Sequence, residues 1–146
     1  MTDYESPYMK DRGHKCKKSA QGMGKEFVAG GTIVAGTFVK FSGADDITVV
    51  TCGAKGALIG VAMNDATVGQ DVMVQMDGYH WIIVGTAASL APGDWVESDA
   101  NGMAVEMDCG GGDSFLGGYV LSTPTDDEDC VCMKIQPCPL CETQRG

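Results

Sequence analysis

The amino-acid sequence predicts a mainly β protein, folded as a compact β-sandwich or barrel-like domain, and three observations support this. From residue 27 onward, short apolar segments rich in Val, Ile and aromatic residues alternate with glycine, aspartate and asparagine turns. The 146 residues include 21 glycines, about twice the usual share of roughly 7 %. No segment keeps the helical period over the roughly 10 to 12 residues that a helix prediction requires. The length fits one compact domain.

Nine strands are expected, because each segment combines β-branched or aromatic residues with partial alternation of apolar and polar positions. In chain order they cover residues 37–41, 47–51, 57–62, 71–76, 79–84, 94–97, 103–107, 116–121 and 129–135. A short helical turn is expected only at residues 87–91.

Three dipeptides between these segments predict particular turns. Asp77-Gly78 joins two apolar runs as a tight hairpin would, and Asn101-Gly102 suits a type I′ hairpin turn. Pro92-Gly93 suits a type II turn, in which proline fixes the first central position and glycine takes the second.

The sequence also aligns with itself. Residues 36–53 align with residues 93–110, and residues 57–76 align with residues 115–134, with a single one-residue insertion. The identities are Gly36/Gly93, Val39/Val96, Cys52/Cys109, Gly53/Gly110, Leu58/Leu116, Gly60/Gly118, Thr67/Thr125 and Asp71/Asp129. Either the chain contains two similar β units, or these identities are no more numerous than those of any glycine-rich β chain aligned with itself. The sequence leaves both interpretations open.

Charge is distributed unevenly along the chain. Residues 1–26 hold six basic and four acidic side chains, whereas residues 27–146 hold four basic and 16 acidic ones. The first segment also lacks an apolar period, which predicts an extended arm before an acidic body. This arm is either a solvated tail or a segment that becomes ordered on an acidic neighbour.

The overall composition excludes several partners. A net charge of −10 argues against binding nucleic acid over the whole surface. The longest apolar runs, such as residues 81–84, are far shorter than a membrane span. Residues 1–18 lack the apolar core of a secretory signal, so we expect synthesis in the cytoplasm.

No catalytic motif is recognisable, so we expect neither an enzyme nor a cofactor. Phosphate-binding, dinucleotide-binding and zincin patterns are missing. Ser114 lies in a sequence that resembles a nucleophile elbow but has leucine in place of the second glycine. His14 falls in the arm, and His80 falls in an expected strand without an evident catalytic partner, which indicates packing or an interface.

Two clusters of potential metal ligands leave alternatives open. Cys138 and Cys141 have C-x-x-C spacing, which suits half of a zinc site or a redox pair. The other half would have to come from Cys130 with Cys132, or from His14 with Cys16. The acidic run at residues 126–129 lacks the spacing of a calcium loop, and we interpret it as a solvated turn or as a patch that receives a basic arm.

Several phrases of the sequence together resemble one protein family. They are residues 34–43 (VAGTFVKFSG), 56–62 (GALIGVA), 68–74 (VGQDVMV) with Gly78, and 90–96 (LAPGDWV). Over about residues 28–135 the chain resembles the capsid decoration (cement) proteins of tailed bacteriophages. The resemblance implies a small β-rich domain, usually trimeric, that binds the outer face of an assembled phage head and stabilises it by bridging major capsid protein subunits. The basic arm and the Cys-containing tail depart from the family pattern.

We therefore expect an extended basic arm at residues 1–26, a decoration domain at residues 27–136 and a Cys-containing tail at residues 137–146. On this hypothesis the arm binds an acidic capsid or subunit surface, and three aromatic residues carry the subunit interface. The basic residues are Lys10, Arg12, Lys15, Lys17 and Lys18, and the aromatic ones are Tyr79, Trp81 and Trp95. The alternative is a small zinc-stabilised or redox-active β domain that uses the C-terminal cysteines.

Overall fold

The structure, a computed structural model, describes residues 24–87, 90–108 and 115–138 and confirms a mainly β fold. The described residues form ten strands and no helix. The strands are β1 (Gly24–Ala29), β2 (Phe38–Phe41), β3 (Thr48–Thr51), β4 (Gly60–Ala62), β5 (Asp71–Gln75), β6 (Gly78–Ile83), β7 (Trp95–Ser98), β8 (Ala104–Glu106), β9 (Leu116–Val120) and β10 (Cys130–Cys138). All nine expected strands are present, with ends that differ by a few residues.

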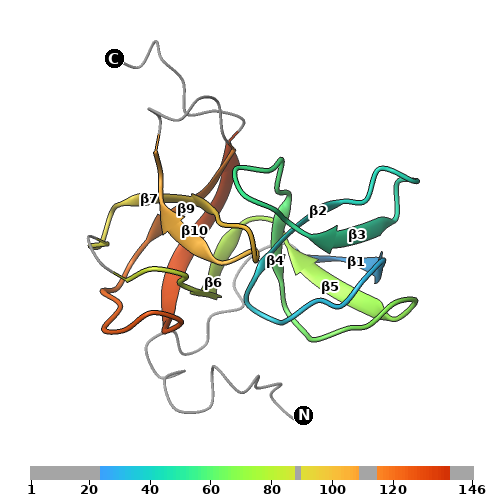
Figure 1. Ribbon diagram of the computed structural model, residues 1–146, viewed down its shortest axis with the longest axis horizontal. Coiled ribbons are helices and arrows are strands. Elements are labelled where there is room, and N and C mark those ends of the chain that lie inside the picture. The colour runs from blue at the N-terminus through green and yellow to red at the C-terminus, as the bar shows by residue number, and fades with distance from the viewer. Residues whose placement is uncertain (1–23, 88–89, 109–114, 139–146) are drawn as a thin grey trace.

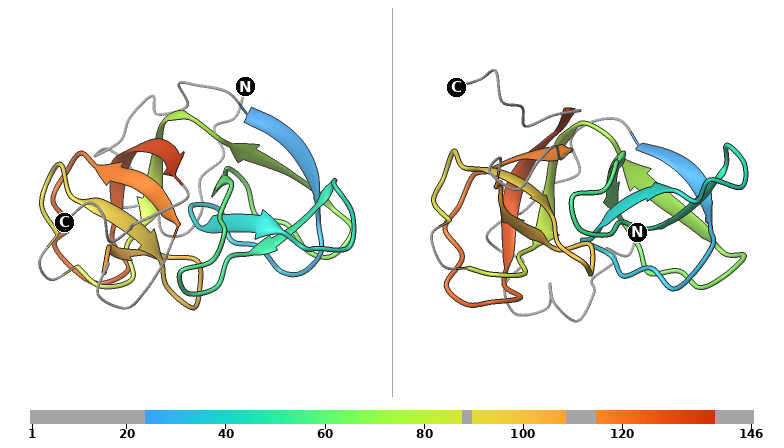
Figure 2. Two further views of the ribbon diagram at one scale, coloured as in Figure 1. Left: turned by 90° about the horizontal axis from the view of Figure 1, so that it is seen from above. Right: turned by 45° about the horizontal axis from the view of Figure 1, so that its top comes forward.

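The strands form two units that follow one another along the chain. Strands β1 to β5 close into a barrel in the order β1-β3-β2-β4-β5, and we call this the first unit. Strands β6 to β10 form a sheet in the order β6-β10-β9-β7-β8, and we call this the second unit. The two units lie side by side in every view (Figures 1 and 2).

The two units have the same topology. Read around the barrel from β1, the order is β1-β5-β4-β2-β3, which matches β6-β10-β9-β7-β8 strand for strand. The registers agree as well, since Phe38 pairs with Val61 in the first unit and Trp95 pairs with Tyr119 in the second. Of the two interpretations that the sequence leaves open, the structure therefore supports two similar β units.

The second unit is nearly closed by the same contact that closes the first. In the barrel, β1 and β3 run parallel and pair Ala29 with Val49. In the second unit a single parallel bridge joins Val84 to Ala104, at the equivalent positions. A barrel without open edges hides the backbone groups that would otherwise pair with other chains.

Residues of the first unit fill the remaining gap between β6 and β8. The Ile83 amide donates to the carbonyl of Gly36 over 2.8 Å, and the Phe38 amide donates to the carbonyl of Gly102 over 2.7 Å. Residues 36–38 thus lie between the two strands. This arrangement joins the units through backbone hydrogen bonds in addition to side-chain packing.

The self-alignment of the sequence is correct for only part of its length. The equivalent positions Gly36/Gly93, Val39/Val96, Leu58/Leu116 and Gly60/Gly118 are confirmed by the strand registers and by matching turn hydrogen bonds. The pairs Thr67/Thr125 and Asp71/Asp129 are out of step by one residue, because the structure matches Thr67 to Asp126 and Gln70 to Asp129.

A difference in loop length explains why the sequence alignment matches Cys52 with Cys109. The paired residues Phe41 and Val49 enclose seven residues, whereas their counterparts Ser98 and Ala104 enclose five. As a result Cys52 corresponds to Met107 and not to Cys109, and Cys109 and Gly110 themselves lie outside the described residues. The alignment of a single sequence with itself cannot place such insertions when the loops consist of interchangeable glycines and aspartates.

Strand β1 was not predicted, and it moves the start of the folded body. Its first residues, Gly24 to Glu26, fall within the expected arm but pair with Gln75, Val74 and Met73 of β5. The three residues are exposed and mostly polar, so they carry no apolar alternation that would mark a strand. The barrel therefore begins at residue 24.

The predicted turns had mixed outcomes. Asp77-Gly78 forms no hairpin, because β5 already has β1 and β4 as neighbours and β6 belongs to the other unit. Asn101-Gly102 does connect a hairpin, β7 to β8, but Gly102 has a positive φ and Asn101 does not, which excludes type I′. Gly93 has φ 96° and the Asp94 amide donates to Ala91, as a type II turn requires. Of the helical turn expected at residues 87–91, residues 88–89 lie outside the described residues.

The two largest of three clusters of buried apolar residues fill the two units. One fills the barrel, and its largest members include Phe27, Ile33 and Val72. The other fills the second unit and includes Phe38 of the first unit, which is fully buried. At Gly117 a Cβ atom would overlap the Phe38 ring, so the glycine makes room for this side chain. Phe38 thus fills the interior of the neighbouring unit.

Candidate interaction surface

His80 and Cys52, two residues with side chains capable of catalysis, are both buried. The His80 ring is buried, and its Nδ1 lies 2.9 Å from the backbone carbonyl of Trp81, which can only accept a hydrogen bond. Burial lowers the pKa of His80 below its ordinary value. Cys52 is also fully buried, and burial raises the pKa of its thiol, as suits a small packing residue.

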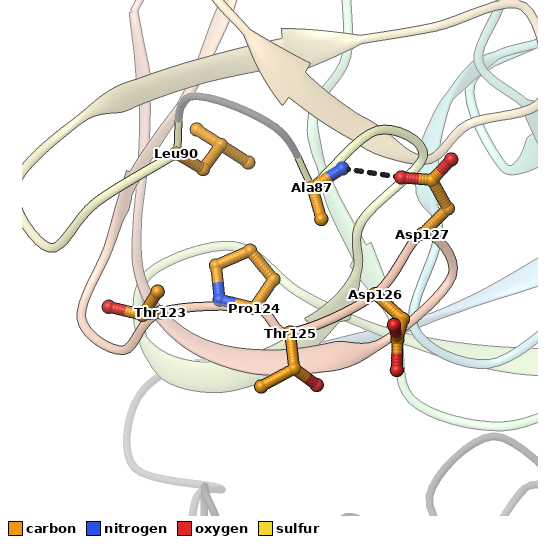
Figure 3. Close-up of a pocket in the computed structure, with 7 residues that line it drawn as sticks. All are labelled: Ala87, Leu90, Thr123, Pro124, Thr125, Asp126 and Asp127. Atoms are coloured by element: carbon orange, nitrogen blue, oxygen red, sulfur yellow. Dashed lines mark hydrogen bonds between the residues drawn. The ribbon is translucent and has the colours of Figure 1, made fainter.

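The acidic run forms a fastened loop. Asp129 is buried, and its carboxylate accepts hydrogen bonds from the Thr125 amide and hydroxyl at 3.0 and 3.1 Å. The Asp127 carboxylate accepts the Ala87 amide at 2.8 Å (Figure 3). An open hollow of about 790 Å³ lies beside this loop, with Leu90 and Pro124 among its lining residues. Part of the run is therefore a structural turn, whereas Asp126 and Glu128 are exposed.

The described segments contain neither a cluster of metal ligands nor a candidate membrane-spanning helix. Within residues 24–87, 90–108 and 115–138, no three His, Cys, Asp or Glu side chains are placed to hold a metal ion. Nor does any helix in these segments have the length and apolar character to cross a membrane. His14, Cys16, Ser114 and Cys141 lie outside the described residues. The zinc alternative thus stays a prediction.

The predicted contact residues fall into three groups. Lys10, Arg12, Lys15, Lys17 and Lys18 lie outside the described residues. Trp81 is only 4 % exposed and packs with Ala35, Ile83 and Cys130. Its ring lies against Gly36, because the connection from β1 to β2 crosses over β6 at this point. Trp81 is therefore a core residue of the chain, and its expected role at an interface stays a prediction.

Tyr79 and Trp95 do lie on the surface, and the sheet brings them into one row. Across β6, β10, β9 and β7, the registers place Tyr79 opposite Lys134, Lys134 opposite Tyr119, and Tyr119 opposite Trp95. Direct partners point to the same side of a sheet. This side is the outer one, since Met133, the neighbour of Lys134, points into the core.

The row forms the centre of an exposed apolar surface. The Trp95 and Tyr119 rings meet edge to face, with centroids 5.4 Å apart. Tyr79 is 42 % exposed, and Leu121, next along the same side, is 41 % exposed. We call Tyr79, Trp95, Tyr119, Leu121 and Lys134 the aromatic face. Its members lie in β6, β7, β9 and β10 and directly after β9. Because these strands are far apart in the sequence, only the strand registers identify Tyr119 and Leu121 as members.

Two further exposed apolar side chains lie on loops at one end of the barrel. Val68 and Ile47 are 72 % and 53 % exposed. The loops that carry them flank the end of β1, because the Val28 amide donates to the Ile47 carbonyl and the Gly69 amide donates to the Ala29 carbonyl, each over 2.8 Å. We call Ile47 and Val68 the barrel tip. Ile47 falls in the expected strand at residues 47–51, and the sequence did not predict that either side chain is exposed.

Hydrogen bonds hold the barrel tip in place. The Asp45 carboxylate accepts the amides of Ile47 and Thr48 at 3.1 and 2.8 Å and the Thr48 hydroxyl at 3.1 Å. These bonds hold the pKa of Asp45 below its usual range. In the other loop, the Gln70 side chain accepts the Thr67 amide at 2.8 Å. Both apolar side chains are thus carried by loops that hydrogen bonds hold in place.

An ion pair fastens the two units to each other. Lys55 of the first unit donates to the Glu97 carboxylate of β7 over 3.0 Å and to the Asp108 carbonyl over 2.8 Å. The Glu97 side chain is only 6 % exposed. Because the Glu97 charge is buried, removing Lys55 would leave an unpaired charge, which costs more than breaking an exposed ion pair.

These features define a class of protein: a small β module of two joined units, each with exposed apolar side chains. A family model for phage cement proteins matches residues 13–135, and the chain therefore belongs to this family of phage virion structural proteins. No curated protein matches the chain significantly. Among solved structures, the chain is similar to the "N base" of head fiber gp8.5 of bacteriophage phi29. The identity is 20 % over 78 % of this chain and 93 % of that chain, with a TM-score of 0.61, which shows a shared fold.

Proposed function

We propose that this protein binds the outer surface of a phage capsid and stabilises it by bridging neighbouring major capsid protein subunits. The observation that carries the proposal is the presence of two separate apolar surfaces on one rigid body, the barrel tip on the first unit and the aromatic face on the second. A protein that reinforces a shell must contact at least two of its parts at once. Exposed apolar surface on a folded module is typical of such contacts.

The joined units suit this role mechanically. A bridge strengthens a shell only if its two contact surfaces keep their separation under load. The Lys55–Glu97 ion pair, the shared apolar core and the backbone bonds of residues 36–38 all oppose movement of one unit against the other. The links of one copy add to those of many other copies on the same shell.

The basic arm supplies a third contact on this proposal. Lys10, Arg12, Lys15, Lys17 and Lys18 bind acidic surface on the capsid or on a neighbouring copy. Each exposed ion pair adds only about 0 to 1 kcal/mol, so the arm acts by number and by reach. The protein is synthesised in the host cytoplasm and functions as a homotrimer on the outside of the virion. Tyr79 and Trp95 contribute to the interface between its subunits.

Capsids assembled without the protein provide the test. Purified protein is mixed with such capsids, and bound copies are counted after sedimentation. We expect saturable binding and increased resistance of the capsids to heat. The double substitution Ile47→Asp and Val68→Asp should lower the amount bound, because each places a charge on the barrel tip.

A matched control separates the effect of surface from the effect of charge. Met73 lies on the outer side of β5 and is 38 % exposed, so Met73→Asp adds a charge elsewhere on the first unit. It should bind as the wild type does. Wild-type protein that leaves capsids unbound and no more stable would contradict the proposed function.

A further inference from the structure

The cores of the two units differ in where their side chains come from. All buried members of the cluster that fills the barrel belong to the first unit. The cluster that fills the second unit has 13 buried members, and four of them come from the first unit, namely Phe38, Cys52, Leu58 and Val61. The third cluster also adds Ala35 of the first unit to Trp81 and Ile83 of the second. Both clusters of the second unit are thus completed by side chains of the first.

Residues 36–38 make backbone hydrogen bonds to both units, one unit along each edge of this segment. Toward the barrel, the segment exchanges two bonds with Ala62, at 2.8 and 2.9 Å. Toward the second unit, its first residue accepts the Ile83 amide over 2.8 Å, and its last residue donates to the Gly102 carbonyl over 2.7 Å. The segment is therefore attached to the barrel along one edge and fills the gap between β6 and β8 with the other.

The first unit also fixes the conformation of this segment and of the residues before it. The Ala35 amide donates to the Asp65 carboxylate over 2.8 Å. The Thr37 hydroxyl donates to the Val34 carbonyl over 2.7 Å. Because these bonds lie within the first unit, the folded barrel presents the segment in the conformation that the second unit contacts. Such preorganisation lowers the entropy cost of docking.

Three glycines allow the segment and the second unit to approach closely. A Cβ atom at Gly36 would overlap the Trp81 ring, and a Cβ atom at Gly117 would overlap the Phe38 ring. A Cβ atom at Gly102 would lie 3.1 Å from the Phe38 carbonyl oxygen. At each of these points the backbone of one unit meets a ring or the backbone of the other. Close complementarity of this kind is typical of the core of a specific interface.

From these observations we infer that the gap between β6 and β8 is a binding site for an extended peptide segment with an aromatic side chain at its end. Residues 36–38 occupy the site within the same chain. The barrel folds without the second unit, because its sheet is closed and its core comes from its own residues. The second unit is folded only while the barrel presents the segment, so the aromatic face exists only on chains whose barrel is folded. This inference concerns the chain by itself and does not depend on the proposed function.

Two adjacent residues of β2 provide a matched pair for the test. The Phe38 side chain lies in the core of the second unit, whereas the Val39 side chain lies in the core of the barrel. Both are fully buried. Hydrogen exchange of backbone amides is measured by NMR on the whole chain as wild type, Phe38→Ala and Val39→Ala. It reports the opening of each strand separately.

In the wild type we expect slower exchange in β1 to β5 than in β6 to β10, because the second unit can open while the barrel stays folded. Phe38→Ala should speed exchange in both units by the same factor, about a hundredfold or more, because the contact that it removes is lost in either opening. Val39→Ala should speed exchange in β1 to β5 alone, by about tenfold or more, because opening of the second unit leaves the packing of Val39 in the barrel intact.

Each of three results would overturn the inference. Slower exchange in β6 to β10 than in β1 to β5 of the wild type would mean that the second unit is the part that folds alone. Faster exchange in β6 to β10 of Val39→Ala would mean that the two units open only together. Unchanged exchange in β1 to β5 of Phe38→Ala would mean that each unit folds independently. If Phe38→Ala leaves β6 to β10 without protection, amides that stay protected in β1 to β5 support the inference, and loss of their protection overturns it.

Discussion

The packing of Phe38 against Gly117 allows a quantitative test of how the two units are joined. The ring is fully buried in the core of the second unit, and a Cβ atom at Gly117 would overlap it. Phe38→Ala should lower the free energy of unfolding by about 3–5 kcal/mol, the usual cost of removing a buried phenylalanine. Gly117→Ala alone should cost about 1–3 kcal/mol, because it overfills the same site.

The double substitution is the informative one. Once the ring is gone, the methyl group that Gly117→Ala adds enters the space that the ring left and no longer collides with it. The pair should therefore be less destabilising than the sum of its members by more than about 1 kcal/mol, the size of coupling that contacting residues show. Neither Phe38 nor Gly117 is a member of the aromatic face, so the side chains of that face are the same in every variant.

Urea unfolding, followed by circular dichroism at one protein concentration, measures all four free energies. Gly31 serves as control, because no atom lies within 4 Å of a Cβ placed there. Gly31→Ala should show no coupling to Phe38→Ala. Additive effects of Phe38→Ala and Gly117→Ala would refute the reasoning, since they would mean that the ring does not pack in the second unit.

Three further predictions concern the ion pair, the buried histidine and the start of the body. Lys55→Ala should destabilise the protein by about 1–3 kcal/mol in urea unfolding, because it leaves the buried Glu97 carboxylate without its cation; an unchanged midpoint would contradict this. Burial lowers the pKa of His80 from its ordinary 6.5, so the unfolded chain takes up the proton first and stability should fall as the pH decreases below 6.5. His80→Gln should flatten that dependence between about pH 7 and 5, and an unaltered slope would exclude the histidine as its source. Deletion of residues 1–23 should leave the unfolding midpoint unchanged, whereas deletion of residues 1–26 removes half of β1 and should lower it; equal midpoints would mean that β1 does not close the barrel.

Sequence reasoning located the strands because their burial alternates. The expected strand at residues 71–76, for example, contains Val72 and Val74, which are buried, and Asp71 and Met73, which are exposed. It missed β1 for the opposite reason, since Gly24, Lys25 and Glu26 are all exposed and obtain their strand conformation from pairing with β5. Pairing between distant segments leaves no local trace in composition.

The candidate site was predictable only in part. Tyr79 and Trp95 stood out as aromatic residues in strands, and both are on the surface, but Trp81 has the same local pattern and is buried. The difference comes from residues 34–36, which cross β6 far from Trp81 in the sequence. Burial on the outer side of a sheet depends on what the rest of the chain lays over it, and a single sequence does not show that.

The most direct test of the account is a cryo-electron microscopy map of phage capsids to which the purified protein has been added. The account predicts density for the two-unit body on the outer surface, with one body in contact with two neighbouring capsid subunits. Density confined to a single subunit, density inside the shell, or bare capsids at saturating protein would contradict it.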